Sequence, residues 1–415
     1  MNRYRKKKYF WFISLFVIYS VISITPLITG MTPPITAPII LLLLLVSVFR
    51  HKRLQISNRI TIVVIIFFMI DVLYHMLGIS ERIGNAITRF SYFMAIIVFL
   101  FIKDYFNGKE KKFVFYSIII IVAANIVDNI RLNILYPMAS VFAIKYEGYE
   151  GLNIGTTMFN TMSLLFYVVC LFMLINTKYK WSKFFYASLC AISVTYILYF
   201  GMRGSVVTIM FLITVLLLIV KFVEKYKMLW LLVPLLAIPI ANPDFVLDFV
   251  RLIIPEGRLV ERLADIQDVV DEGVSDSSFT GRVRLYEVSL NTYTANISNF
   301  LFGIGEHMAS KQEVGQAGTG VGGHSEFIDV LAKWGTLGAI LIIYFFYCTY
   351  KVFINLTSNR KLRNQIKVLF LALLLCGFFK TIFSSYIGIV VFILLPLSVW
   401  MIENEEKNIV RQTRT

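Results

Sequence analysis

The chain has 415 residues, of which 58% are hydrophobic and 16% are charged. Soluble domains carry roughly 45–50% apolar and about 25% charged residues, so this composition excludes a soluble enzyme with one anchor, a coiled coil and a disordered chain. The formal net charge is +15, from 40 basic and 25 acidic residues. In a protein that crosses a membrane many times, an excess of basic residues indicates which loops lie in the cytoplasm. We therefore do not take the charge as a sign of a nucleic-acid partner, and we expect none.

Long apolar runs predict an all-α polytopic membrane protein with about 12 transmembrane helices, because about 20 residues cross a bilayer. The second and ninth runs are short or contain proline. Basic residues at positions 3–8 precede the first run, and no small-residue cleavage site follows it, so we interpret it as a retained helix. The runs lie near residues 9–28, 33–49, 59–79, 87–106, 112–129, 154–176, 181–200, 204–222, 227–242, 324–350, 364–380 and 384–402.

The distribution of charge is consistent with this topology. With the N-terminus in the cytoplasm, the terminal segments and the alternate loops on that side hold 27 of the 40 basic residues. About 18 of the 25 acidic residues fall on the other side. Because cytoplasmic loops of membrane proteins are enriched in Lys and Arg, we expect both termini in the cytoplasm.

A polar segment at 242–323, between the ninth and tenth helices, is expected to form one large, mainly helical extracytoplasmic loop domain. It predicts a helix from 281 to about 297, a tight turn at 301–305, and a glycine-rich stretch at 315–323 that is not expected to hold one shape. Loops of this length are usually functional when ordered. The chain then divides into helices one to nine (1–241), the loop domain (242–323), helices ten to twelve (324–402) and a cytoplasmic tail (403–415).

Arginine residues on the expected outer side are candidates for anion binding. Arg203 lies between glycines in a very short turn, where it is either an interface arginine with a snorkelling stem or a fork that binds phosphate oxygens. Arg282 and Tyr286 are four residues apart and share a helix face, whereas Arg284 points elsewhere. The alternative for the second group is pairing with carboxylates of the same loop.

His324 lies where the glycine-rich stretch meets the tenth helix, and is followed by Ser325 and Glu326. A neutral imidazole there could take a proton from a sugar hydroxyl, although an isolated histidine can also be structural. Asp71 and His75, four residues apart in the third helix, form a further candidate pair without an identified partner. The acidic series at 265–276 is better explained as a solvated helix face than as a metal site. We therefore expect no metal and no cofactor.

Three motifs together resemble the bacterial O-antigen ligase and O-antigen or capsule polymerase family of polytopic, lipid-linked-glycan transferases. Met202 and Ser325 stand where serine and asparagine are commonest in that family. The motifs are Gly201-Met202-Arg203-Gly204-Ser205, then Gly281-Arg282 with Phe302-Gly303-Ile304-Gly305, and finally His324-Ser325 with Gly335-Thr336-Leu337-Gly338.

The resemblance implies metal-independent glycosyl transfer on the outer face of the bacterial cytoplasmic membrane. Donor and acceptor would be glycans on undecaprenyl pyrophosphate, and a chain-length regulator and a flippase are further candidate partners. It implies that Arg203 and Arg282 hold the pyrophosphate and that His324 is the general base. The substrate-binding positions would be Arg284, Tyr286, Gly204, Ser205, Ser325 and Glu326.

A polymerase is favoured over a ligase because the outer loop is neither strongly basic nor long enough to suggest a dock for an anionic acceptor. A lipid-linked glycan flippase or transporter is a second alternative, but transporters place polar residues at the bilayer midplane, and the expected helices are almost entirely apolar. A third alternative is a carrier-dependent glycosyltransferase of the type that has acidic residues in its first outer loop. The loop at 30–34 contains no carboxylate, which argues against this alternative.

Overall fold

The computed structural model describes residues 58–78, 83–135, 157–201, 204–222, 278–310, 318–323, 325–380 and 382–412. Within these ranges the protein is almost entirely helical and has no strand beyond a single bridge between Met308 and Val321. Seven of the described helices are long and apolar enough to cross a membrane. The expected helices at 9–28, 33–49 and 227–242 lie outside the described residues, so the total of twelve spans stays a prediction.

Helices occur where the apolar runs predict them. The two largest differences from expectation are at C-terminal ends: the fifth predicted helix continues to Leu135, and the last one continues to Gln412 through good helix formers. The helices are α3 (Asn58–Met76), α4 (Ile83–Tyr105), α5 (Gly108–Leu135), α6 (Thr157–Asn176), α7 (Lys180–Thr195) with the π-helix η2 (Tyr196–Gly201), α8 (Gly204–Phe222), α12 (Ser278–Thr294), α13 (Ile297–Phe302), α15 (Glu326–Ile354), α16 (Arg360–Phe379), and α17 (Ser385–Ile389) with η4 (Val390–Leu394) and α18 (Leu395–Gln412).

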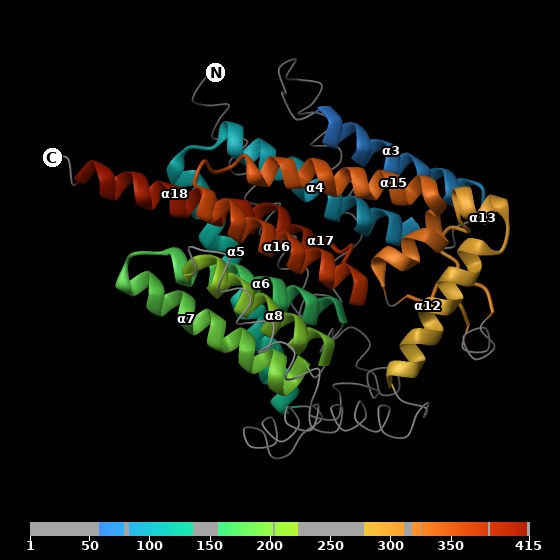
Figure 1. Ribbon diagram of the computed structural model, residues 1–415, viewed down its shortest axis with the longest axis horizontal. Helices are drawn as coiled ribbons and strands as arrows, with labels where there is room; N and C mark the ends of the chain where they lie inside the picture. The colour runs from blue at the N-terminus through green and yellow to red at the C-terminus, as the bar shows by residue number, and fades with distance from the viewer. Residues whose placement is uncertain are drawn as a thin grey trace.

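The long helices pack side by side into one bundle (Figure 1). Helices α3, α4 and α15 form one side, α6, α7 and α8 form the other, and α16 to α18 lie between them. Phe93 of α4 joins several of these helices, because its ring centroid lies 5.1 Å from Phe67, 4.8 Å from Phe345 and 5.0 Å from Phe383. Such edge-on and tilted contacts add to the free energy of burial, so α3, α4, α15 and the start of α17 pack as one unit.

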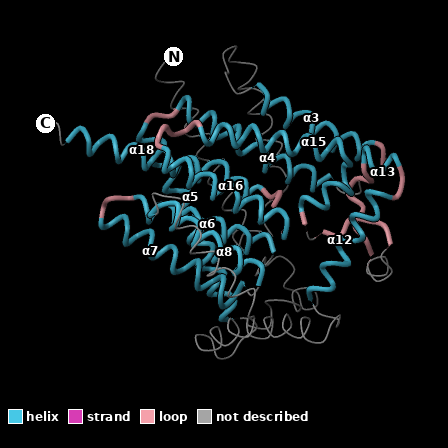
Figure 2. The backbone as a smooth tube through the Cα atoms, viewed as in Figure 1, coloured by secondary structure: helices cyan, strands magenta, loops and turns pink. Residues whose placement is uncertain are grey.

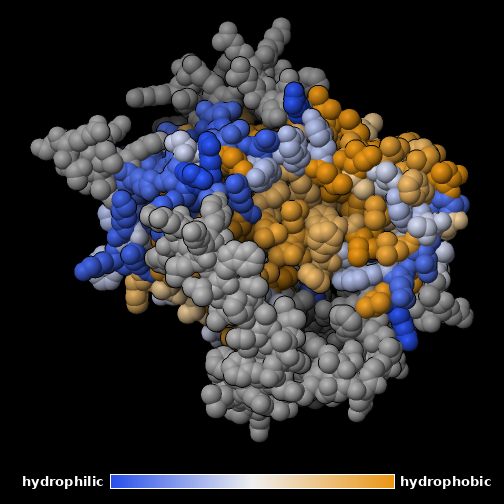
Figure 3. All heavy atoms as spheres, in the orientation of Figure 1, coloured by the Kyte–Doolittle hydropathy of each residue, from blue (hydrophilic) through white to orange (hydrophobic). Residues whose placement is uncertain are grey.

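Basic turns gather at one end of the bundle. Lys221 at the end of α8 donates to Asn176 Oδ1 over 2.8 Å, and the neighbouring Thr177 hydroxyl donates to Glu405 of α18 over 3.0 Å. Figure 3 shows hydrophilic side chains over the same end, where α18 and the turn between α6 and α7 lie in Figure 1. Basic residues of the turn between α6 and α7, of the end of α8 and of α18 thus lie at one end of the bundle, and which side of the membrane this end faces stays a prediction.

The opposite end carries α12 and α13, joined to α15 by loops (Figure 2). The predicted tight turn follows α13: Gly303 has a φ of 75°, and the next two residues bond to the backbone of α15. The Ile304 N–H donates to the Ala332 carbonyl and the Gly305 N–H to the Lys333 carbonyl, both over 2.9 Å. The turn is therefore bonded directly to the backbone of α15.

A backbone break inside α15 makes room for this turn. Gly335 has φ 61° and ψ −163°, within a helix that the sequence predicts to be continuous. A Cβ atom added to Gly303 would lie 2.4 Å from the Lys333 carbonyl carbon, and one added to Gly335 would lie 2.4 Å from the Leu301 carbonyl carbon. Each glycine thus leaves space for the backbone of the other segment.

The glycine-rich stretch was expected not to hold one shape, and the structure corrects this for residues 318–323. Val321 donates to the His307 carbonyl over 2.9 Å and accepts from the Ala309 N–H over 3.0 Å. Gly320 donates to the Thr292 hydroxyl of α12 over 2.6 Å. Backbone pairing with 307–309 and side chains of α12 fix this part of the stretch.

We predict that Gly303→Ala and Gly335→Ala destabilise the protein more than Gly78→Ala. Gly78 also has a positive φ, 71°, but nothing lies within 4 Å of the added Cβ. Its substitution therefore measures only the conformational cost of about 1–2 kcal/mol, whereas the other two add a backbone collision. The melting temperature in detergent tests this, and equal losses for the three variants would show that the close approach contributes nothing.

Candidate functional site

Charged side chains are buried together at the end of the bundle opposite the basic turns. This corrects the expectation that the helices are almost entirely apolar. Charged groups inside a membrane bundle are costly and commonly functional, so the cluster is the candidate site. Its members, each no more than 7% exposed, are Asp71, Arg89, Glu306, Glu326, Asp329, Lys333 and Lys380.

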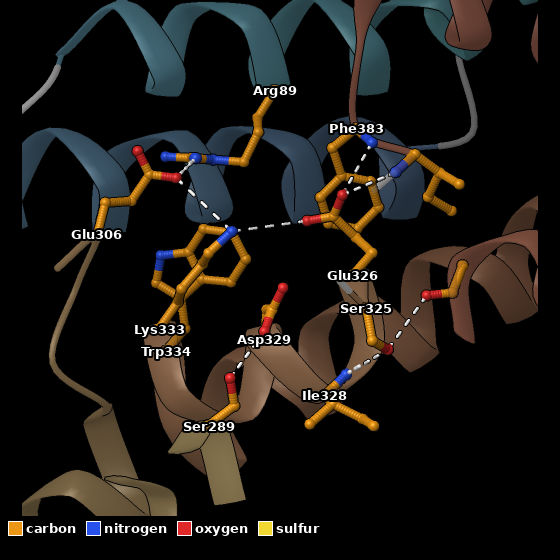
Figure 4. A network of polar contacts seen from close by, with 12 residues as sticks. Arg89, Ser289, Glu306, Ser325, Glu326, Ile328, Asp329, Lys333, Trp334 and Phe383 are labelled. Carbon is orange, nitrogen blue, oxygen red and sulfur yellow. Dashed lines mark hydrogen bonds and ion pairs between the residues drawn. The ribbon is translucent and has the colours of Figure 1, made fainter. Parts of the chain in front are cut away.

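Arg89 of α4 bridges two carboxylates from distant parts of the chain. Its Nε lies 3.0 Å from Asp71 Oδ2 of α3, and its Nη1 pairs with Glu306 Oε1 in the loop after α13. Trp334 of α15 supports the pair, because its Nε1–H donates to Asp71 Oδ1 over 3.0 Å and its ring lies 4.9 Å from the guanidinium carbon. Figure 4 shows the guanidinium between Glu306 and the indole. One planar fork thus joins α3, α4, α15 and the outer loop.

Lys333 extends the network along α15. Its ammonium lies 3.8 Å from Glu306 Oε1 and 3.8 Å from Glu326 Oε1, and Figure 4 shows it between the two carboxylates. The other oxygen of Glu326 accepts backbone N–H groups from Ile382, over 2.8 Å, and Phe383, over 3.1 Å. The start of α15 is therefore tied to the segment that leads into α17.

Asp329 links α15 to α12 and to the glycine-rich stretch. The Ser289 hydroxyl of α12 donates to Asp329 Oδ1 over 2.8 Å and accepts from the Gly322 N–H over 2.9 Å. Among the described residues, Asp329 Oδ2 and Glu306 Oε2 accept no hydrogen bond. Buried acceptors without a donor are costly, so these two atoms are the places where the network could accept a proton or a donor group of a ligand.

Two of the predicted substrate-binding residues lie at the edge of this cluster. Ser325 is fully buried and caps α15, because its Oγ accepts from the Ile328 N–H over 3.3 Å. Glu326 is engaged with Lys333 and with backbone N–H groups, as described above. Both side chains make structural contacts here, and their role in substrate binding stays a prediction.

The other predicted residues are placed only in part. α12 is helical over positions 282 to 286, and the Arg284 side chain is exposed. η2 ends at Gly201 and α8 begins at Gly204, so two residues separate these helices. Outside the described residues lie Arg203, His324, the side chains of Arg282 and Ser205, and the acidic series at 265–276.

The structure brings together the second and third motifs, through the glycines of the turn and of α15, but it leaves the mutual placement of Arg203, Arg282 and His324 as a prediction. Asp71 gains the partner that the sequence did not reveal, Arg89. Arg89, Asp329 and Lys333 were visible in the sequence as single charges inside apolar runs, whereas Glu306 lies in a loop and gave no such signal. No group of three or more His, Cys, Asp or Glu side chains in the described ranges is placed to hold a metal ion.

The fold defines a helical membrane protein with several apolar spans and a buried charge network at one end. Comparison with protein-family models gives no match, and comparison with curated proteins gives none either. Function is therefore inferred from the residues and their arrangement.

We predict that Arg89→Ala destabilises the protein far more than Arg131→Ala. Loss of Arg89 leaves the buried Asp71 without a cation and Glu306 with only Lys333, at 3.8 Å, and removal of one partner of a buried pair typically costs about 3–5 kcal/mol. Arg131 makes a surface pair with Asp128 over 2.7 Å, its side chain is 50% exposed, and such pairs contribute about 0–1 kcal/mol. Unfolding by SDS in mixed micelles measures both. Similar small losses would show that the network does not hold the bundle end together.

Proposed function

We propose that this protein is a polymerase that joins undecaprenyl-pyrophosphate-linked oligosaccharide repeat units into a surface polysaccharide on the outer face of the bacterial cytoplasmic membrane. The observation that carries the proposal is the contact between two of the three motifs: the turn at Gly303 fits against the backbone break at Gly335. Motif residues that are distant in the sequence therefore form one structural unit, at the bundle end away from the basic turns.

The proposed reaction needs two things from the site: groups that stabilise the charge on the leaving pyrophosphate, and a base for the acceptor hydroxyl. In the donor, the anomeric carbon is bonded to a pyrophosphate oxygen, which is already a good leaving group. Arg203 and Arg282 would hold the pyrophosphate and stabilise the charge that develops on it. His324 would take the proton of the acceptor hydroxyl as its oxygen bonds to the anomeric carbon and the bond to pyrophosphate breaks. The lipid pyrophosphate leaves, and no metal is required.

The described residues support this scheme by anchoring the backbone on both sides of position 324. Gly322 is bonded to Ser289, which in turn bonds Asp329. On the other side, Ser325 caps α15 and Glu326 binds two backbone N–H groups. A general base has to lie within hydrogen-bond reach of the proton that it takes. Contacts that hold the backbone on both sides of position 324 would help to keep the base in such a position.

A ligase, with the same donor and a different acceptor, is the nearest alternative. The choice of a polymerase rests on the expected outer loop, which is neither strongly basic nor long enough for a dedicated anionic acceptor. In the polymerase scheme, Arg284, Tyr286, Gly204 and Ser205 lie close to the two lipid-linked substrates.

A lipid-linked glycan flippase or transporter is the second candidate, and the presence of a buried charge network is the observation in its favour. Charged groups inside a bundle, such as Asp71, Arg89 and Lys333, are features of ion- and substrate-conducting paths. Their location at one end of the bundle, and their close pairing, fit an anchoring role better than a path across the membrane.

We predict that His324→Ala and Arg203→Ala abolish long surface-glycan chains in cells whose only copy of the gene carries the substitution, while single repeat units still reach the surface. Loss of a general base typically slows a reaction about 10²–10⁴-fold. The matched controls are His307→Ala and Arg131→Ala, whose side chains are exposed and which should keep the full ladder.

A glycan ladder on a gel, with immunoblotting for equal protein in the membrane, reads the result. Loss of single repeat units from the surface as well would favour transport. Normal ladders in both variants would contradict the assignment of the site.

A further inference from the structure

The short helix α13 exposes apolar side chains that its own protein does not cover. Its sequence, Ile-Ser-Asn-Phe-Leu-Phe, carries no charge. Ile297 is 74% exposed and Phe302 50% exposed, and Phe300 and Leu301 are exposed as well. Clusters of this kind on a polar loop mark an interaction surface.

Contacts with α3 and α15 fix the level of α13 relative to the membrane spans. The Tyr74 hydroxyl, close to the end of α3, donates to the Phe302 carbonyl, and the turn after α13 packs on Gly335. The 19 residues of α3 span about 28 Å at 1.5 Å per residue, close to the roughly 30 Å of a bilayer core. α13 therefore lies beside the boundary where α3 ends.

The exposed face of α13 continues the apolar faces of those two spans. Leu73, Met76 and Leu77 at the end of α3 are exposed, as are Leu337 and Ile340 of α15. Figure 3 shows hydrophobic side chains running along the α3 side of the bundle as far as the end where α13 lies in Figure 1. Because α3 and α15 are long and apolar enough to span the membrane, these exposed residues face lipid, and the face of α13 is continuous with them.

We propose that α13 is seated in the membrane interface, with Ile297, Phe300 and Leu301, which share one face of the helix, among the acyl chains of the leaflet at this end of the bundle. Aromatic and aliphatic side chains at this level are the usual interfacial anchors, and the neighbouring polar residues Ser298 and Asn299 remain at the headgroups. The second half of the outer loop is then attached to the bilayer, in contrast to the free-standing domain that its sequence suggests.

An environment-sensitive fluorophore attached to cysteine tests this seat in the full-length protein. The native cysteines in the described ranges, Cys170, Cys190, Cys348 and Cys376, are buried. I297C and L301C carry the reporter on the apolar face of α13, and E287C, at an exposed position of α12, is the matched control. The protein is reconstituted in phosphatidylethanolamine–phosphatidylglycerol vesicles with a nitroxide at carbon 5 of the acyl chain, and iodide is the aqueous quencher.

Reporters at 297 and 301 should be quenched several-fold more by the lipid nitroxide than by iodide, and the reporter at 287 should show the reverse. Stronger quenching by iodide at both α13 positions would overturn the proposal. Protection from both quenchers would also overturn it, because a protein surface, such as a second copy of the chain, would then cover α13. F300C provides an independent position on the same face if L301C does not reach the wild-type melting temperature.

Discussion

The guanidinium of Arg89 lies out of water at the end of the bundle, between carboxylates from α3 and from the loop after α13 and above the indole of Trp334. In such a medium an unpaired charge is very costly, so the three segments have to stay where they neutralise one another. A buried ion pair adds little net stability compared with apolar packing. We therefore assign it the role of specifying one arrangement: α3, α4, α15 and the outer loop cannot shift separately without leaving a charge unpaired.

The same arrangement places the backbone elements that carry the motifs. Lys333, which shares Glu306 with Arg89, is also the residue whose carbonyl accepts the Gly305 N–H. The side-chain network and the glycine contact thus converge on one turn of α15. From there, Glu326 and Asp329 tie the start of α15 to the segment before α17 and to α12. The polar end of the bundle is therefore held by contacts between several segments, and the proposed chemistry and the proposed membrane seat of α13 both depend on them.

Sequence alone predicted the spans well and the network poorly. The apolar run at 204–222 matches α8, and that at 59–79 is close to Asn58–Met76, because hydropathy is a local property. Asp71 was singled out because a charge inside an apolar run is conspicuous, but its partner could not be named from the sequence. Arg89 lies 18 residues from Asp71, and the second carboxylate that Arg89 binds, Glu306, lies 217 residues beyond Arg89. The break at Gly335 was missed for a similar reason, since only the approach of Leu301 requires it. Arg203, Arg282 and His324 remain assigned from their motifs.

Hydrogen–deuterium exchange of the full chain carrying Arg89→Met, in nanodiscs, tests most directly whether one buried guanidinium holds these segments together. We predict faster amide exchange than in the wild type in three separate segments, at 70–76, 303–310 and 326–335, with α7 and α8 unchanged. Faster exchange confined to α4 around position 89, with those three segments as protected as in the wild type, would contradict this role of Arg89.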